Sequence, residues 1–125
     1  MKAVVKLVVL CATLLLLTGM AFADGGTYCA CYKIDYFGLD LVYTGTQYYP
    51  ICLNYEEHSG TSDGCDLFLF DGLSNQVLAT CPGCVAYFKF HGQDNNVLSG
   101  MEYCGGTGGR FILWGHKTDP SNCKP

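Results

Sequence analysis

The chain has 125 residues, of which seven are basic and eleven acidic, and nine are cysteines. This length suits one small domain and is short for two independent hydrophobic cores. The basic residues form no cluster and are outnumbered by acidic ones, which makes nucleic acid, heparin and anionic membranes unfavourable partners.

Residues 1–23 predict a secretory signal peptide. Two lysines come before or at the start of an apolar run at 7–17, and Ala21-Phe22-Ala23 places small residues at the positions of a cleavage site. The apolar run is shorter than the ~20 residues that a membrane-spanning helix needs. We therefore expect a secreted, extracellular mature domain at 24–125 that has no membrane anchor. Lys2 and Lys6 belong to the predicted signal peptide, so the mature domain has five basic residues and eleven acidic ones.

The next signals along the chain are short runs rich in Tyr, Phe, Val and Ile, each bounded by Gly, Asn, Asp or Ser. Apolar alternation is clearest at 66–70 and 86–90, and both runs hold more apolar residues than a half-exposed strand needs, which predicts burial on both faces. No convincing helical stripe follows residue 24. The predicted fold class is therefore all-β, a small disulfide-stapled antiparallel domain. The predicted strands are 29–37, 41–43, 48–53, 66–70, 76–79, 85–90 and 110–114.

The two halves of the mature chain share the order of their conspicuous residues. Each half has a cysteine, an aromatic strand, Gly-x-Asp, Thr-Gly or Ser-Gly, and a second cysteine, and each continues with an apolar strand that ends in glycine. This order predicts an internal duplication, 29–81 and 82–123, in which two Greek-key-like β-units pack as a sandwich. A chance alignment in a chain rich in Gly, Tyr and Cys is the alternative. The matched residues are Gly38, Asp40, Thr44, Gly45 and Cys52 in the first half, and Gly92, Asp94, Ser99, Gly100 and Cys104 in the second.

The cysteines of the mature chain predict four disulfides, because their number is even and an exported domain folds in an oxidising compartment. If the halves are equivalent, Cys31 pairs with Cys52, and Cys84 with Cys104. Cys29 and Cys31 lie too far apart along one strand to bond to each other. The remaining four allow three pairings. The eight cysteines are Cys29, Cys31, Cys52, Cys65, Cys81, Cys84, Cys104 and Cys123.

The spacing Cys81-Pro-Gly-Cys84 is also that of redox and zinc sites. A redox site needs a helix whose N-terminus lowers the pKa of the first thiol, and no helix signal follows Cys84. A zinc site needs a second cysteine pair at suitable spacing, and Cys29-Ala-Cys31 is too tight for that. We therefore interpret both cysteines as structural.

A polar loop late in the chain is the candidate for a cation. Asp94, Asn95, Asn96 and Ser99 offer carboxylate, amide and hydroxyl oxygens at short spacing, which are ligands that calcium accepts. The segment NNVLSG, residues 95–100, resembles the calcium loop of βγ-crystallin domains, but Gly100 stands where that loop has its last serine. We do not assign the chain to that family. A plain turn between strands is the competing interpretation. We expect no other cofactor.

Catalytic motifs are scarce. Glu56, Glu57 and His58 can be read as an acid–base cluster, but three consecutive polar residues in a turn-rich stretch more often form a solvated loop. Neither His91 nor His116 belongs to a nucleophile or metal motif. The sequence therefore favours a protein that is not an enzyme.

Nine tyrosines, one tryptophan and the glycine-rich segment 104–110 favour flat aromatic surface. The function we predict is a secreted structural or recognition protein of an extracellular coat or matrix, whose partner is a matrix polymer or a protein surface. A secreted effector, meaning a toxin, defence factor or protease inhibitor, is the alternative. A small secreted hydrolase is the third.

Overall fold

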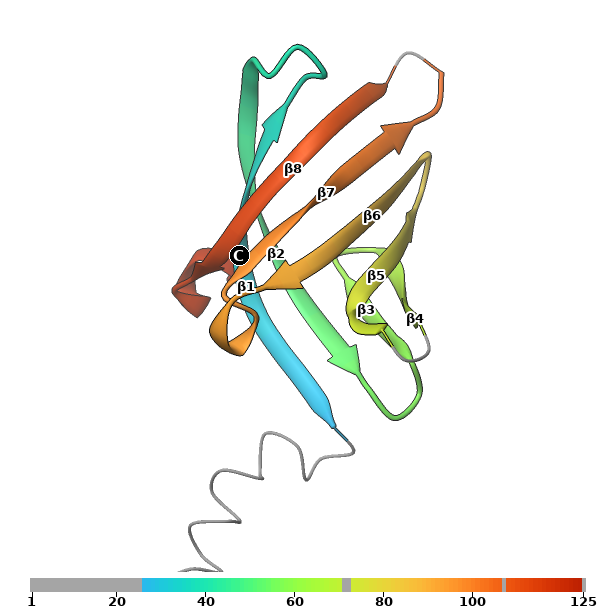
Figure 1. The fold of residues 1–125 in the computed structure, drawn as a ribbon, viewed down its shortest axis with the longest axis vertical. Helices are drawn as coiled ribbons and strands as arrows, with labels where there is room; N and C mark the ends of the chain where they lie inside the picture. The colour runs from blue at the N-terminus through green and yellow to red at the C-terminus, as the bar shows by residue number, and fades with distance from the viewer. Residues whose placement is uncertain (1–25, 71–72, 107, 125) are drawn as a thin grey trace, which may run out of the picture.

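Eight consecutive antiparallel strands close into one barrel in the computed structural model, which describes residues 26–70, 73–106 and 108–124 (Figure 1). Two short 3-10 helices, η1 and η2, accompany the strands. The predicted signal peptide lies outside the described residues. The strands are β1 (Thr27–Phe37), β2 (Tyr43–Asn54), β3 (Ser59–Ser62), β4 (Cys65–Phe70), β5 (Leu73–Cys81), β6 (Cys84–His91), β7 (Val97–Cys104) and β8 (Gly109–Thr118); η1 is Gln93–Asn95 and η2 is Pro120–Cys123.

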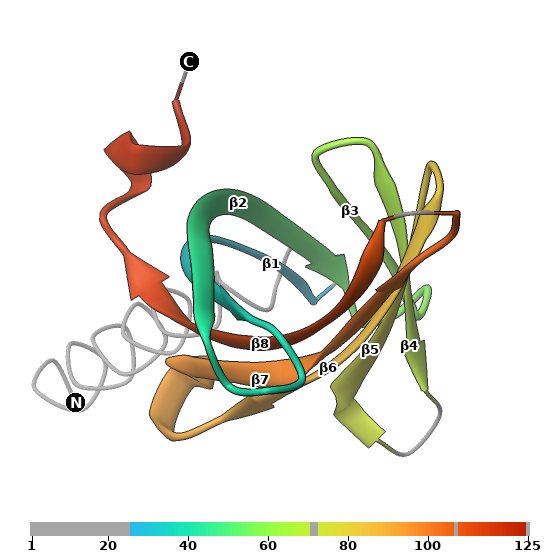
Figure 2. The same ribbon diagram turned by 90° about the horizontal axis from the view of Figure 1, so that it is seen from above.

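The strand order follows the chain from β1 to β8, and the sheet closes where β1 pairs with β8. The all-β, disulfide-rich fold class is confirmed. The expected Greek-key sandwich is wrong, because each strand pairs with its neighbour in sequence. The 11-residue β1 is long enough to pair with β2 along its whole length and with β8 along its second half (Figure 2). Closure removes the unpaired edges that an open sheet would expose.

The two proposed repeat units occupy consecutive arcs of this single sheet. Residues 29–81 take in β1 to β5, whereas residues 82–123 take in β6 to β8. Two arcs of one barrel do not form the facing layers of a sandwich, so the expected packing of the units is wrong. The duplication itself stays a prediction about the sequence.

The sequence did not predict two of the strands, β3 and β7. β3 is the polar segment Ser59–Ser62, and it forms a hairpin with β4 through Asp63 and Gly64, whose φ angles are 46° and 88°. Positive φ at both positions is the geometry of the tightest hairpin turn, for which Asp-Gly is a favoured pair. β7 begins directly after the candidate calcium loop and pairs with both β6 and β8.

Inward-facing residues of seven of the strands fill the barrel; β3 contributes none to the hydrophobic core. On β6, for example, Ala86, Phe88 and Phe90 are buried while Val85 and Tyr87 are exposed. The prediction that segments 66–70 and 86–90 are buried on both faces is therefore wrong. The surplus apolar residues of these strands lie on the outside. The core comprises Tyr32, Ile34, Ile51, Leu53, Leu67, Leu69, Val77, Ala79, Ala86, Phe88, Phe90, Leu98 and Leu113.

Four disulfides pair all eight cysteines of the described chain: Cys29–Cys52, Cys31–Cys123, Cys65–Cys81 and Cys84–Cys104. The expected Cys84–Cys104 bridge is present, and Cys29 and Cys31 are not bonded to each other. The Cys31–Cys52 pairing is wrong, because the register of β1 and β2 sets Cys29 opposite Cys52 and Cys31 opposite Pro50. Cys31 instead holds η2 against the barrel.

Candidate functional site

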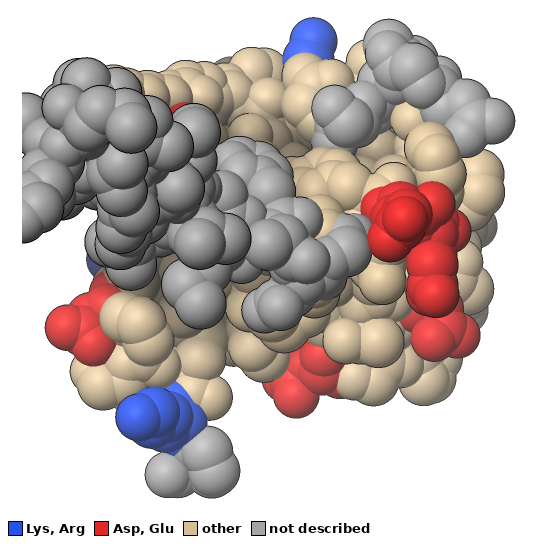
Figure 3. Space-filling view, turned by 90° about the horizontal axis from the view of Figure 1, so that it is seen from below, with Lys and Arg blue, Asp and Glu red and all other residues tan. Residues whose placement is uncertain are grey.

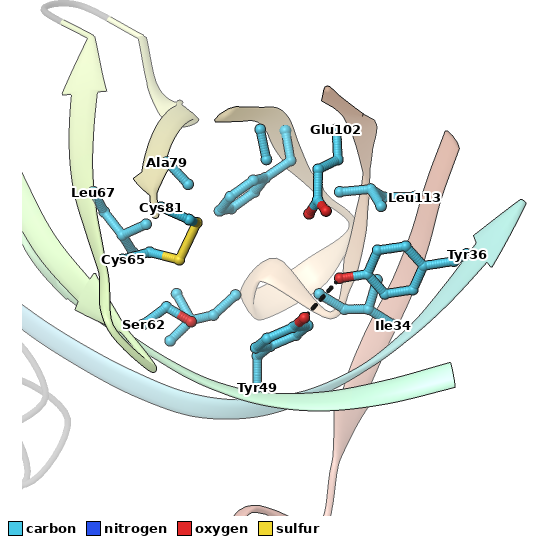
Figure 4. A pocket seen from close by; sticks show the side chains of 13 residues that line it. Ile34, Tyr36, Tyr49, Ser62, Cys65, Leu67, Ala79, Cys81, Glu102 and Leu113 are labelled. Atoms are coloured by element: carbon cyan, nitrogen blue, oxygen red, sulfur yellow. Dashed lines mark hydrogen bonds between the residues drawn. A yellow bond between two sulfur atoms is a disulfide. The ribbon is translucent and has the colours of Figure 1, made fainter. Parts of the chain in front are cut away.

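A cavity opens at the end of the barrel where β7 ends, and among the described residues that line it Glu102 is the one carboxylate. Strand β7 turns Leu98, Gly100 and Glu102 inward, because alternate residues of a strand point to the same face. Gly100 leaves room for the neighbouring strand, since a Cβ atom there would lie 2.6 Å from the Cα atom of Phe88. Glu102 is the next inward residue, and its carboxylate points into the cavity (Figure 4).

The cavity is small and mostly apolar. Its volume is about 60 Å³, far below the roughly 300–1,000 Å³ of ordinary small-molecule sites. The side chains that surround it come from all eight strands and include the Cys65–Cys81 disulfide (Figure 4). The barrel interior is therefore nearly filled by its own side chains. The lining residues are Ile34, Tyr36, Tyr49, Ile51, Ser62, Cys65, Leu67, Ala79, Cys81, Ala86, Phe88, Glu102 and Leu113.

Two tyrosine hydroxyls and the Ser62 hydroxyl are the other polar side-chain groups that line the cavity. The Tyr36 hydroxyl donates to the Tyr49 oxygen at 2.8 Å, and the Tyr49 hydroxyl donates to Oε1 of Gln47 at 2.6 Å. Burial raises the pKa of both tyrosines, and the negative charge of Glu102 adds to the increase. Both hydroxyls therefore stay protonated at neutral pH.

Among the described residues no hydrogen-bond donor contacts the Glu102 carboxylate. Its nearest polarisable neighbour is the Cys104 sulfur at 3.4 Å, and this sulfur has no proton because it is bonded to Cys84. Burial raises the pKa of Glu102 above its ordinary value because the apolar mouth disfavours the charged form. The two sulfurs and the carboxylate lie within 4.8 Å of one another, but disulfide sulfurs lack the thiolate charge that binds metals.

The opposite end of the barrel is plugged. The Tyr32 hydroxyl, in the fully buried core, donates to the backbone oxygen of Asn95 at 2.6 Å, and the Asn95 amide donates to the Tyr55 hydroxyl at 3.2 Å. A second tyrosine, Tyr28, shares a hydrogen bond with Tyr32 at 2.8 Å. The η1 turn is thus fixed across this end by hydrogen bonds to tyrosines.

The candidate calcium residues belong to this plug. Asn95 directs its amide to Tyr55, and Ser99 Oγ lies 2.6 Å from Nε2 of His91 on the outer face. Asp94 and Asn96 line a shallow polar hollow together with the cation Lys117. Two of the four predicted ligands are therefore engaged with other side chains.

The Cys81-Pro-Gly-Cys84 motif is the β5–β6 hairpin turn. Pro82 precedes Gly83, whose φ of 80° suits a type II turn. Cys81 and Cys84 face each other in the sheet, yet each bonds to a cysteine of its other neighbouring strand. The structural interpretation of the motif agrees with the structure.

The histidines do not line the cavity at the open end. His91 and His116 lie on the outer face on either side of Val97, and His58 is in the turn before β3. Glu56 and Glu57 are exposed in the same turn as His58.

A row of apolar side chains crosses the outside of the barrel. These five residues are direct partners on five adjacent strands, so they form one continuous band. Three of them are substantially exposed, Phe68 at 49%, Tyr87 at 43% and Met101 at 53%. We call this band the outer belt; it consists of Phe68, Leu78, Tyr87, Met101 and Ile112.

Next to the outer belt lies a shallow hollow with two aromatic walls. Leu78, Tyr87 and Met101 line it on the belt side, and Tyr103 and Arg110 line it on the other, with a volume of about 330 Å³. The Arg110 guanidinium lies 5.2 Å from the centre of the Tyr103 ring. The Tyr87 hydroxyl donates to Gln76. The hollow therefore combines ring surface with hydrogen-bonding groups at its rim.

Charge is distributed unevenly over the molecule. On the face seen from below, several acidic side chains gather in one group and others lie apart, while the visible basic side chains lie apart from each other (Figure 3). No patch of basic side chains is present on that face to attract a polyanion.

Comparison with known protein families, with curated proteins and with solved structures found no match to this chain. The described residues contain no helix that is long and apolar enough to cross a membrane.

Sequence reasoning missed Glu102, Tyr87 and Met101. The signal for Glu102 was the alternation Leu98, Gly100, Glu102 on β7, which sets Glu102 on the same face as a core leucine, whereas Tyr87 lies on the predicted strand 85–90. Strand β7 was not predicted, because Ser99, Gly100 and Glu102 interrupt its apolar residues. For the same reason the outward position of Met101 was not apparent.

Proposed function

We propose that this protein is a secreted, non-enzymatic recognition protein that associates with an uncharged polysaccharide of an extracellular coat or matrix. The outer belt is the observation that carries this proposal. Five register-matched apolar residues, with exposed aromatic rings among them, give a solvent-facing surface that the fold does not need for its core. Exposed apolar surface of this kind marks a site of association.

The chemistry of the belt and its hollow suits a sugar polymer. A pyranose ring has an apolar C–H face and a rim of hydroxyl groups, so it packs on an aromatic ring while its hydroxyls bond at the edge. Tyr87 and Tyr103 supply rings on two sides of the hollow, and Arg110 supplies donors. The excess of acidic residues favours an uncharged polymer over an anionic one.

The barrel interior supports this proposal by its size. A cavity of about 60 Å³ has no room for a lipid or another ligand of ordinary size, so a carrier function is disfavoured. Four disulfides and the absence of a spanning helix in the described residues are compatible with an extracellular location.

The test is binding to insoluble polysaccharides, with chitin, cellulose and a β-glucan as uncharged polymers, heparin–agarose as the anionic one and collagen as a protein surface. We expect retention on at least one uncharged polymer. The double variant Tyr87→Ser with Met101→Ser should bind at least ~10-fold more weakly, a loss of ~1.4 kcal/mol. Tyr48→Ser is the matched control, because Tyr48 is equally exposed but lies on β2, outside the belt.

Retention on collagen alone, or equal binding by both variants, would contradict the proposal. Release of soluble sugars from a retained polymer would replace it with the hydrolase alternative.

A further inference from the structure

The open mouth of the barrel contains an anion with no counter-charge. Glu102 is one of thirteen residues around an otherwise largely apolar cavity, and no described residue donates a hydrogen bond to its carboxylate. Removing a carboxylate from water without a compensating donor is costly. Glu102 is partly buried and its carboxylate still reaches solvent at the mouth, so the arrangement suits a cationic ligand that enters from outside.

The neighbouring hydroxyls add to this argument, because they are already committed as donors. Gln47 Oε1 accepts the proton of Tyr49, so the Tyr49 oxygen accepts the proton of Tyr36. Toward the cavity the Tyr36 hydroxyl then presents its oxygen lone pairs. Figure 4 shows this hydroxyl and the Glu102 carboxylate directed to the same space. Both groups are acceptors, so they favour a ligand that is a donor; Ser62 also lines the cavity, and its hydroxyl can accept as well as donate.

Size and shape limit the class of cation. A cavity of about 60 Å³ has room for a few waters, or for a group of a few non-hydrogen atoms. An ammonium group has three donors and no acceptor, and it is compact. Rings of Tyr36, Tyr49 and Phe88 line the cavity and can attract a cation to their faces.

We propose that the open mouth of the barrel binds a primary ammonium group on a short alkyl chain, with Glu102 as its counter-charge and the Tyr36 oxygen as a second acceptor. The ligand is a small free amine or the end of a lysine side chain that enters from outside. Glu102 also borders the hollow beside the outer belt, but this proposal concerns the cavity inside the barrel and does not use the residues of the belt.

The experiment is an NMR titration of the disulfide-bonded protein with n-propylammonium and with Nα-acetyl-lysine amide; n-propanol is the neutral analogue and tetramethylammonium is the cation without donors. We expect saturable shifts centred on β7 and on Tyr36, with a Kd on the order of millimolar for propylammonium. Propanol and tetramethylammonium should bind at least ~10-fold more weakly. Binding of the lysine derivative alone would support a polypeptide source, and binding of both would support the shared chemistry.

Glu102→Gln keeps the shape of the side chain and removes its charge, so it should weaken propylammonium binding by at least ~10-fold. Asp66→Asn removes the same charge from the outer surface of β4, beside the same mouth, and should change the Kd by less than ~2-fold. No saturable binding to either amine would overturn the proposal. Equal affinity in Glu102→Gln, or equal binding of propanol, would also overturn it.

The wild-type protein provides a test that needs no variant. Lowering the pH protonates Glu102 while the ligand stays charged, so the affinity should fall in acid. The titratable groups that face Glu102 are Tyr36 and Tyr49, with Asp63 acting on Tyr49, and both tyrosines remain protonated in this range. An affinity that does not change with pH would contradict the role of the carboxylate.

Discussion

The two ends of the barrel use the same side chain for opposite purposes. Each end has a pair of tyrosine hydroxyls 2.8 Å apart. At the plugged end the hydroxyl network ends on the backbone of Asn95 and holds η1 in place. At the open end it ends on the side chain of Gln47 and leaves an unpaired carboxylate facing a cavity. Tyrosine clusters in a small barrel can therefore close one end and shape a binding site at the other.

The disulfides give the largest expected effects, and they differ in the length of chain that they close. Cys31–Cys123 spans 92 residues and fixes η2 outside the barrel, whereas Cys65–Cys81 spans 16 residues inside the open mouth. The loop-entropy model predicts a loss of about 4.5 kcal/mol for Cys31→Ala with Cys123→Ala, and about 3 kcal/mol for Cys65→Ala with Cys81→Ala. Denaturant unfolding of both double variants measures the two losses in the free energy of unfolding and shows which is larger. A larger loss at Cys65–Cys81 would mean that packing in the mouth outweighs chain entropy.

The sequence predicted the strands and the number of disulfides better than it predicted the closure of the sheet into a barrel. Alternation at 86–90 identified β6 correctly, and the even number of cysteines indicated four bridges. Closure depends on β1 pairing with β8, a contact between residues about 80 positions apart that leaves no local pattern. The Asp63-Gly64 turn was a readable hairpin signal, but the strand before it consists of Ser, Gly and Thr.

The candidate sites could not be predicted from the sequence, because they depend on the register between strands. The pairing of Cys52 with Cys29 in place of Cys31 is a shift of two residues, which leaves the faces unchanged and so has no signature in hydrophobicity. The outer belt exists only because Leu78, Tyr87 and Met101 fall opposite one another. In the sequence nothing distinguishes Glu102 from the other ten acidic residues, because its inward position depends on the placement of β7.

The tyrosine pairs allow a direct test of the contrast between the ends. Tyr32→Phe leaves the backbone oxygen of Asn95 without its donor in the core, and we expect a loss of about 1–3 kcal/mol in the free energy of unfolding. Tyr36→Phe should cost less, about 0.5–1 kcal/mol, because water at the mouth can donate to Tyr49 in its place. Urea unfolding of both variants gives the comparison. Equal losses would show that the mouth is as closed to water as the plugged end.

The charge of Glu102 should make the open end sensitive to pH. Burial raises the pKa of this carboxyl above its ordinary value of 4.5, so the folded chain keeps the proton to a higher pH than the unfolded chain does. The stability contributed by the protonated form is fully present below the ordinary pKa and is lost as the pH rises through the folded pKa. The stability of the wild type relative to Glu102→Gln should therefore decrease as the pH rises from below the ordinary pKa of 4.5 through the raised pKa of the folded chain.

Thermal unfolding of the two proteins across this range measures that difference. Asp119 has the opposite sign, because hydrogen bonds from Ser121 lower its pKa and its contribution is lost as the pH falls. Asp119 is present in both proteins, so its effect cancels in the comparison. A difference that rises with pH would indicate that a cation already pairs with Glu102.

The smallest effect is expected from calcium, and it concerns the plugged end. Asn95 and Ser99 are held by Tyr55 and His91, and Lys117 lines the same hollow as Asp94. A cation there would have to displace two hydrogen bonds and approach a positive charge, which opposes binding. We therefore expect that millimolar calcium leaves the melting temperature unchanged, both in the wild type and in Asp94→Ala. An increase in the wild type alone would show that the plug rearranges to release its oxygens, and that both ends of the barrel bind cations.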